Sequence, residues 1–188
     1  DTRNNLIRMI HGKTNLVHTI AGMPGKKGFS GDGGLASRSK LADPISISLS
    51  PDEKTLLIAD IQNRRVRAID LTTGLIRTIA GNGNRGIPKD GENAIEQPLT
   101  DPRACVMDME GNLYILERGG NALRVIRPDG KIFTVAGTGK KGDRDGYARK
   151  ATFSGPKHLC MDSEGKAIIA DDNNHLIRLY DPNTKQVS

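Results

Sequence analysis

The chain repeats itself with a period of about 57 residues. Thr19-Ile20-Ala21-Gly22 returns twice, as Thr78-Ile79-Ala80-Gly81 and as Thr134-Val135-Ala136-Gly137. A second marker follows nearly the same spacing, because an arginine comes seven residues after each of four acidic residues: Asp1, Asp60, Glu117 and Asp171. A fixed period in this range indicates stacked supersecondary units, as in a solenoid or a propeller. Function in such folds usually lies on one loop-bearing face.

The composition favours an all-β fold. Among 188 residues there are 22 glycines and nine prolines, which indicate many short turns, and the apolar residues are grouped in runs of strand length. The formal net charge of +6 favours acidic partners, although a charge of this size is also ordinary for a soluble domain. There is no apolar run long enough to span a membrane, so no membrane partner is predicted.

One repeat reads as four strands. Residues 45–50 alternate between apolar and polar, which predicts a half-buried strand. Residues 55–60 are nearly all apolar, as expected for a strand covered on both faces. Two more strands follow at 66–71 and 75–80, and then a long glycine-rich link at 81–98. The next repeat copies this plan at 105–108, 113–116, 122–126 and 131–136. Four antiparallel strands and a long link are the plan of a β-propeller blade.

The repeats at the two ends look incomplete. The first supplies strands only at 6–10 and 16–21, and the last only at 158–162, 167–170 and 176–180. The thirteen predicted strands make about three blades, whereas propellers normally close with four to eight. We therefore expect the remaining blades from a longer chain or from a second copy. The predicted organisation is a partial blade and link at 1–43, blades at 44–98 and 99–153, and a partial blade at 154–188.

These repeats resemble the NHL repeat, whose blades look like G-P-x-G-V-A-V-D, G-N-L-Y-I-A-D, N-H-R-I-R and T-V-A-G. Here residues 101–108 read D-P-R-A-C-V-M-D, residues 111–117 read G-N-L-Y-I-L-E, and residues 174–178 read N-H-L-I-R. The resemblance covers essentially the whole chain and implies part of a six-bladed ring, in the variety with long glycine-rich links. The chain departs from the pattern at Glu117 and at His158. The family includes RNA-binding, protein-binding, extracellular and lyase proteins, so the resemblance implies a fold and not an activity.

Basic residues recur where loops of such a blade should meet. The link and the connection between the second and third strands fall at the same end, and the innermost strands begin there. Glycine-rich turns can bind anions through backbone N–H groups, and basic side chains add charge. The alternative is that these basic residues are merely solvated. The candidate ligand-binding residues are Lys26, Lys27, Arg64, Arg85, Arg103, Lys140, Lys141, Lys157, His158 and His175.

The recurrent acidic residues favour a structural role over a catalytic one. We expect those at the ends of the second strands to accept hydrogen bonds from backbone N–H groups of the following connection, and their partner arginines to bridge neighbouring blades. Asp32, Asp90 and Asp145 each precede a glycine, which predicts turns. Cys105 and Cys160 differ by one position along their strands, so they should lie on opposite faces and form no disulfide.

The predicted function is that of a non-catalytic binding or scaffold module that recognises a protein or an anionic ligand through this basic loop face, with no cofactor. The first alternative is a channel-site enzyme of the NHL lyase type, with a metal near His158. The second is RNA binding, for which only Phe29 and Tyr147 look free to stack on bases. Nothing in the sequence indicates a cellular compartment.

Overall fold

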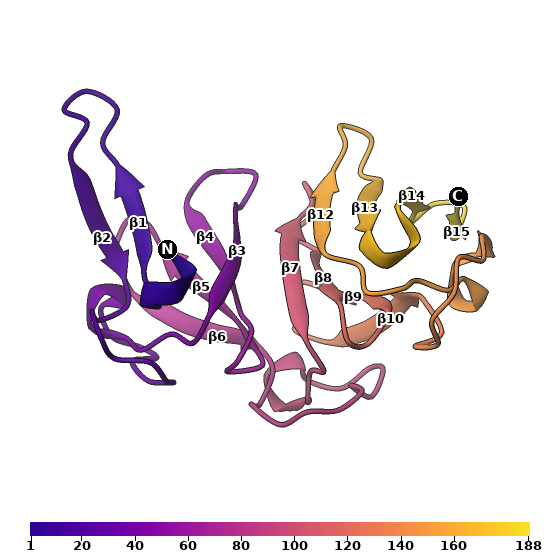
Figure 1. Ribbon diagram of the computed structural model, residues 1–188, viewed down its shortest axis with the longest axis horizontal. Helices are drawn as coiled ribbons and strands as arrows, with labels where there is room; N and C mark the ends of the chain where they lie inside the picture. The colour runs from indigo at the N-terminus through magenta and orange to yellow at the C-terminus, as the bar shows by residue number, and fades with distance from the viewer.

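The computed structural model describes residues 1–188 and consists of antiparallel strands joined by turns and long links (Figure 1). Four sheets follow one another along the chain. The first contains β1 (Ile7–Ile10) and β2 (Val17–Ala21), and the second contains β3 (Pro44–Leu49), β4 (Thr55–Asp60), β5 (Arg65–Asp70) and β6 (Ile76–Ala80). The third contains β7 (Pro102–Met107), β8 (Leu113–Glu117), β9 (Ala122–Ile126) and β10 (Ile132–Ala136). The prediction of an all-β fold of four-stranded antiparallel sheets is confirmed.

The last sheet has more strands than the sequence predicted. Its inner three are β12 (His158–Met161), β13 (Ala167–Asp171) and β14 (Leu176–Asp181). A fourth strand, β15 (Gln186–Val187), pairs with β14, and β11 (Gly146–Tyr147) of the preceding link pairs with β15. The prediction of only three strands here was wrong, because strands of two residues are too short to show any alternation of apolar and polar residues.

The sheets pack face to face with their innermost strands together, as in a propeller. β7 contacts β3 on one side and β12 on the other, at the centre of the molecule in Figure 1. Three separate buried apolar clusters fill the spaces between successive sheets. In the second and third sheets a central strand contributes to two clusters and is therefore apolar on both faces: β4 places Leu57 in one cluster and Ile58 in another.

Each long link runs along the outer edge of the sheet that follows it, where it makes a short 3-10 turn. The turns are η2 (Ala36–Arg38), η3 (Ala94–Glu96) and η4 (Ala148–Lys150). The first residue of each donates its N–H to a turn of the next sheet: Ala36 to Gly74 O at 2.8 Å, Ala94 to Gly130 O at 2.9 Å and Ala148 to Lys185 O at 2.9 Å. The links therefore cover outer edges that would otherwise be open for pairing. Two further 3-10 turns, η1 (Thr2–Asn4) and η5 (Asp172–Asn174), complete the helical content.

None of the helical segments has the length and apolar character needed to cross a membrane.

Candidate binding surface at the link end

A buried carboxylate at the end of the second strand holds the start of each complete sheet. Asp60 accepts a hydrogen bond from Ala42 N at 2.7 Å, Glu117 from Thr100 N at 2.5 Å, and Asp171 from Ser154 N at 2.7 Å. All three donors lie in the preceding link, two residues before a proline that begins β3 or β7 or, in the last sheet, precedes β12 by two residues. The prediction that these carboxylates bind backbone N–H groups of the following connection was wrong. That connection supplies side-chain amides instead, from Asn63 and Asn174.

The arginine seven residues later pairs with the same carboxylate inside its own sheet. The nitrogen–oxygen distances are 3.6 Å for Arg67–Asp60, 2.7 Å for Arg124–Glu117 and 3.0 Å for Arg178–Asp171. All six side chains are buried. The expectation that these arginines bridge neighbouring blades was wrong. The other partners of Arg67 and Arg178 lie in the link, and that of Arg124 is the Thr134 hydroxyl in β10 of its own sheet.

The acidic residues of the links complete these clusters. Asp32 binds Arg67 at 2.7 Å and also accepts from the Thr78 hydroxyl at 2.7 Å, while Asp145 binds Arg178. Asp90 differs, because it accepts from Thr134 N at 2.7 Å and pairs with Arg149 at 2.8 Å. The prediction of turn formation alone was therefore incomplete for these three residues. Since their carboxylates are all engaged in the framework, we assign them no catalytic part.

Burial dominates the titration of Asp60. It raises the pKa of this carboxyl to about 6, against the opposing effects of its donors Asn63 and Ala42 and of the Arg67 guanidinium. The guanidinium lies 3.6 Å away from the carboxylate, so its charge compensates only part of the desolvation. Of the three buried ion pairs, the pair of Asp60 and Arg67 thus has the longest distance and the least complete charge compensation.

The short connections and the long links lie at one end of the molecule, the link face, at the bottom of Figure 1. Side-chain amides of the connections between second and third strands donate to link carbonyls: Asn63 to Gly28 O at 2.7 Å, Asn121 to Gly139 O at 3.3 Å and Asn174 to Gly142 O at 2.7 Å. The predicted meeting of these two kinds of loop is confirmed by these contacts.

The candidate basic residues fall into two groups on the link face. Lys27 pairs with Asp43 at 3.5 Å and Lys157 with Asp172 at 2.7 Å, so their charges are partly compensated. Four exposed side chains of the links make no ion pair within 4.0 Å: Lys26, Arg85, Lys140 and Lys141.

Two more candidates border the same face. Arg64 and Arg85 line a hollow of about 230 Å³ together with Asp101. Arg103 is half-buried where the register of β7 shifts between Pro102 and Ala104. The face therefore gathers cations from three successive links and from the beginning of the innermost strand β7.

The two candidate histidines are both exposed. His158 begins β12 and alternates with Leu159, which packs on the third sheet, so His158 lies on the opposite face together with Cys160. His175 ends the short turn η5 with a φ of 56°. Within residues 1–188 no group of three or more His, Cys, Asp or Glu side chains has the arrangement of a metal site. Both cysteines are free, as predicted from their register, but only Cys105 is buried; Cys160 is exposed, although a buried thiol was expected there.

Neither aromatic residue expected to stack on RNA bases is free on the link face. The guanidinium of Arg65 lies 3.7 Å from the centre of the Phe29 ring, and that of Arg67 lies 4.8 Å away. Tyr147 belongs to β11, on the outer edge of the last sheet. The role of Arg65 was missed from sequence: it also donates to Asn82 O at 2.7 Å and thus fastens two links. Its only sequence signal is its place beside Arg64.

Comparison with known proteins gives relatives that are much longer than this chain. No family model matches. Protein SUPPRESSOR OF QUENCHING 1, chloroplastic, of Arabidopsis thaliana is 34% identical over 159 residues, which cover 81% of this chain and 15% of that protein. NHL repeat-containing protein 2 of Homo sapiens is 31% identical over 180 residues, which cover 85% of this chain and 24% of that protein. The chain thus spans no more than a quarter of these relatives.

Solved structures support the architecture. An auxiliary nutrient binding protein from Bacteroides ovatus superposes with a TM-score of 0.71 at 19% identity, over 100% of this chain and 44% of that one. Virginiamycin B lyase from Staphylococcus aureus superposes with a TM-score of 0.58 at 14% identity, over 98% of this chain and 48% of that one. At these identities the likeness shows the fold alone. Together with the 31% identity to NHL repeat-containing protein 2 over 85% of this chain, the fold shows that the chain belongs to the NHL-repeat β-propeller family.

Proposed function

We propose that this chain is a non-catalytic recognition module whose link face binds an acidic segment of a protein partner. One observation carries the proposal: Lys26, Arg85, Lys140 and Lys141 are exposed at the same end of the molecule and have no carboxylate partner. They come from three successive links, so the positive charge extends across several sheets. Such a field raises the rate and the selectivity of encounters with acidic surfaces.

The links add backbone donors to this charge. Glycines with positive φ recur beside the cations, at Gly25, Gly83, Gly139 and Gly142. Turns of this kind direct successive N–H groups to one side and favour anions. A protein segment is favoured over RNA because Phe29 already stacks on two arginines and Tyr147 lies at the outer edge. Binding of single-stranded RNA usually relies on exposed aromatic platforms.

We also propose that further blades of the same ring, six in all, cover the apolar surface at the two ends of this chain. Ile45, Ile47 and Leu49 are exposed on the face of β3 that turns toward the first sheet, and Ile177 in β14 is 72% exposed. Apolar surface of this extent usually marks an interface. A longer polypeptide is the favoured source, because the relatives are at least four times as long as the matched segment. Binding of the dye ANS to the 188-residue chain tests this; a soluble monomer that binds none would contradict it.

The main test measures binding of a fluorescein-labelled poly-glutamate peptide by anisotropy at low and at physiological salt. We expect binding that weakens with salt and that is lost in the variant Lys26→Ala/Lys140→Ala/Lys141→Ala. The matched control is Lys13→Ala/Lys54→Ala/Lys131→Ala, which removes the same charge from exposed turns at the opposite end. If both triple variants bind equally, the link face is not the site. Preferential binding of a poly-uridine RNA would assign the same face to nucleic acid and overturn the protein partner.

A further inference from the structure

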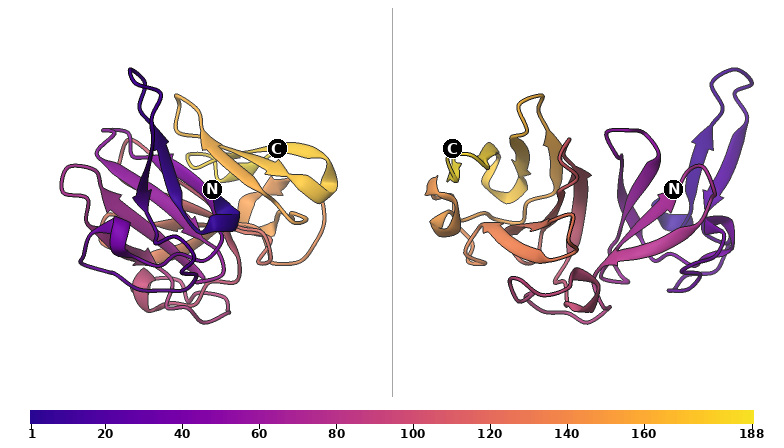
Figure 2. Two further views of the ribbon diagram at one scale, coloured as in Figure 1. Left: turned by 60° about the vertical axis from the view of Figure 1, so that its left-hand side comes forward. Right: turned by 180° about the vertical axis from the view of Figure 1, so that it is seen from behind.

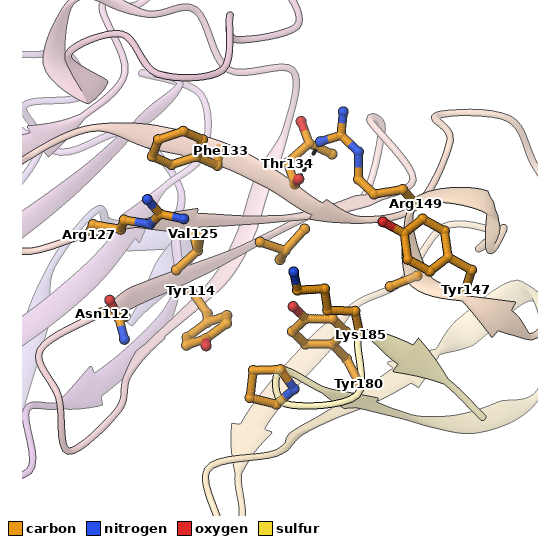
Figure 3. Close-up of a pocket in the computed structure, with 13 residues that line it drawn as sticks. Asn112, Tyr114, Val125, Arg127, Phe133, Thr134, Tyr147, Arg149, Tyr180 and Lys185 are labelled. Atoms are coloured by element: carbon orange, nitrogen blue, oxygen red, sulfur yellow. Dashed lines mark hydrogen bonds between the residues drawn. The ribbon is translucent and has the colours of Figure 1, made fainter.

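A cavity of about 340 Å³ lies between the third and fourth sheets, bordered by η4 and by the turn between β14 and β15 (Figure 3). Its volume lies within the range of small-ligand sites, about 300–1,000 Å³, near the lower end. None of the ten candidate residues on the link face lines it. It is therefore a second feature, separate from the proposed function.

The cavity gathers most of the aromatic side chains of the protein. The chain has no tryptophan, three tyrosines and three phenylalanines, and all three tyrosines and Phe133 line this one space. Tyr114 and Tyr180 are 4% exposed and form its inner part, while Tyr147 is 48% exposed and borders its mouth. Flat aromatic walls of this kind suit a flat ring, which can pack against them offset or edge to face.

The charged residues that line the cavity are all basic. They are Arg127, Arg149 and Lys185. Arg149 is paired with Asp90 at 2.8 Å, but Arg127 lies over the Phe133 ring at 4.2 Å, and neither Arg127 nor Lys185 makes an ion pair. In Figure 3 the ammonium of Lys185 points toward the middle of the group. Two positive charges are thus left for a ligand to compensate.

The neighbouring interface shows that the fold does not require these residues. Between the second and third sheets the same positions of the repeat carry different side chains, and Leu57 and Ile126 belong to a buried apolar cluster there. Each pair gives the cavity residue first and its counterpart second: Tyr114 and Leu57, Tyr180 and Ile126, Tyr147 and Asn93, Phe133 and Arg77, Arg127 and Asp70, Arg149 and Ile95, Lys185 and Gly130. By contrast the framework is copied, as in Ala148 and Ala94.

Among the cavity residues that differ from their counterparts, Lys185 differs most in its backbone requirement. It adopts a left-handed conformation with a φ of 56°, and the equivalent residues are Asn15 with 56°, Gly74 with 72° and Gly130 with 81°. Glycine takes this conformation without steric cost, whereas a residue with a Cβ is disfavoured. The chain therefore places a lysine beside the cavity at a position where its other repeats use glycine or asparagine, the residues that best tolerate this conformation.

We propose that this cavity binds a small planar aromatic anion, a ring that carries a phosphate or a carboxylate. The ring packs among the three tyrosines, and the anionic group meets Lys185 and Arg127. Hydrogen bonds between charged partners are the stronger kind, and guanidinium groups match the geometry of phosphate and carboxylate. A free aryl acid and a nucleotide share this chemistry, so the test includes both.

Tyrosine emission reports directly on this site, because the chain has no tryptophan and every tyrosine lines the cavity. We expect phenyl phosphate, benzoate or AMP to change this emission in a saturable way, with calorimetry confirming the affinity. Cyclohexyl phosphate, which lacks a planar ring, and benzyl alcohol, which lacks the charge, should bind at least about tenfold more weakly.

Two variants locate the ligand. Lys185→Gly introduces the residue of the second and third repeats, and we expect it to weaken binding about tenfold. Tyr147→Asn does the same at the mouth of the cavity and should also weaken binding. Lys150→Ala, an exposed charge outside the cavity, is the matched control, and circular dichroism checks that all variants fold.

Each possible result of these binding measurements either supports the site or overturns it. Tighter binding of AMP points to a nucleotide, and tighter binding of phenyl phosphate or benzoate to an aryl acid; both support the site. Equal binding of cyclohexyl phosphate, an unchanged affinity in Lys185→Gly, or no saturation by any aromatic anion up to about 10 mM overturns it. The triple lysine variant of the link face should bind these probes normally, so failure of one proposal leaves the other standing.

Discussion

The interface between the second and third sheets and the interface between the third and fourth sheets use the same positions of the repeat but are filled differently. The first packs Leu57, Ala68 and Ile126 into a closed apolar cluster. The second places Tyr114, Val125 and Tyr180 there and leaves a cavity of about 340 Å³. The comparison teaches that the repeat fixes the backbone, while the side chains between sheets remain free to diverge.

What the two interfaces share is the cluster at the link end. Sheets on both sides bury a carboxylate and an arginine, and both links bind the next sheet through the same N–H to carbonyl bond. Figure 2 shows the path of the links between the sheets. We infer that the shared groups and the closed apolar cluster support the stability of the fold, and that the divergent groups of the open interface carry recognition. The predictions below test this division, beginning with the shared part.

Removal of a buried arginine should have the largest effect. Arg124→Ala leaves Glu117 buried without its partner, which typically costs about 3–5 kcal/mol of unfolding free energy. Urea denaturation followed by circular dichroism measures it. Arg77→Ala, an exposed arginine of β6, is the control and should change stability by less than about 0.5 kcal/mol. Similar losses in the two variants would mean that the buried pair is not a main support.

Truncation of an apolar side chain in the closed interface should have the second-largest effect on the free energy of unfolding. Leu57 is fully buried, so Leu57→Ala should cost about 2–5 kcal/mol through lost burial and the space left behind. Tyr147→Ala at the open interface removes a half-exposed ring and should cost less than about 1 kcal/mol. Denaturant titration of both variants measures the contrast. Equal costs would show that the aromatic interface is as much a structural core as the aliphatic one.

The pH dependence of stability should reveal the incomplete charge compensation of Asp60. The pKa of Asp60 is about 6 in the folded protein, above its ordinary value of 3.8, so folding favours the protonated form. The resulting stabilisation is complete below the unfolded pKa and is lost as the pH rises through 6. From pH 7 to pH 5 the protein should therefore gain about 1 kcal/mol relative to Asp60→Asn. Unfolding at pH 7, 6 and 5 measures this, with Asp129→Asn as an exposed control; parallel profiles for all three proteins would contradict it.

Much of the fold follows from the sequence because strand period and repeat length are local signals. The strand bounds of β4 and β9 agree with the prediction to the residue. β11 and β15 were missed because their pairing depends on the path of the link and not on their own side chains. The donors to the buried carboxylates were misassigned for the same reason: Ala42 precedes Asp60 by 18 residues and meets it only after the link has turned back.

Less of the candidate site than of the fold could be predicted from the sequence. The grouping of the basic loops at one end followed from strand order, but their pairing did not, since Lys27 and Lys157 find carboxylates and Lys26 does not. The aromatic cavity was not predicted because its three tyrosines are far apart in the sequence: Tyr114 lies in β8, Tyr147 in the following link and Tyr180 in the last sheet. A usable signal was present: in register, each of them replaces an aliphatic or amide residue of the sister repeat.

The smallest effect should come from the residue that most clearly separates the two interfaces. Lys185→Gly relieves a left-handed conformation that costs a side-chain residue about 1 kcal/mol, but it also frees the unfolded chain by about 0.4–1 kcal/mol. These terms nearly cancel, so thermal melting should show a change below about 0.5 kcal/mol. The reverse change, Gly130→Lys, brings the same strain into the closed interface and serves as the matched comparison. If Lys185→Gly instead destabilises the protein by more than about 1 kcal/mol, the lysine stem packs against the tyrosines as part of the core, and its departure from glycine has a structural cause.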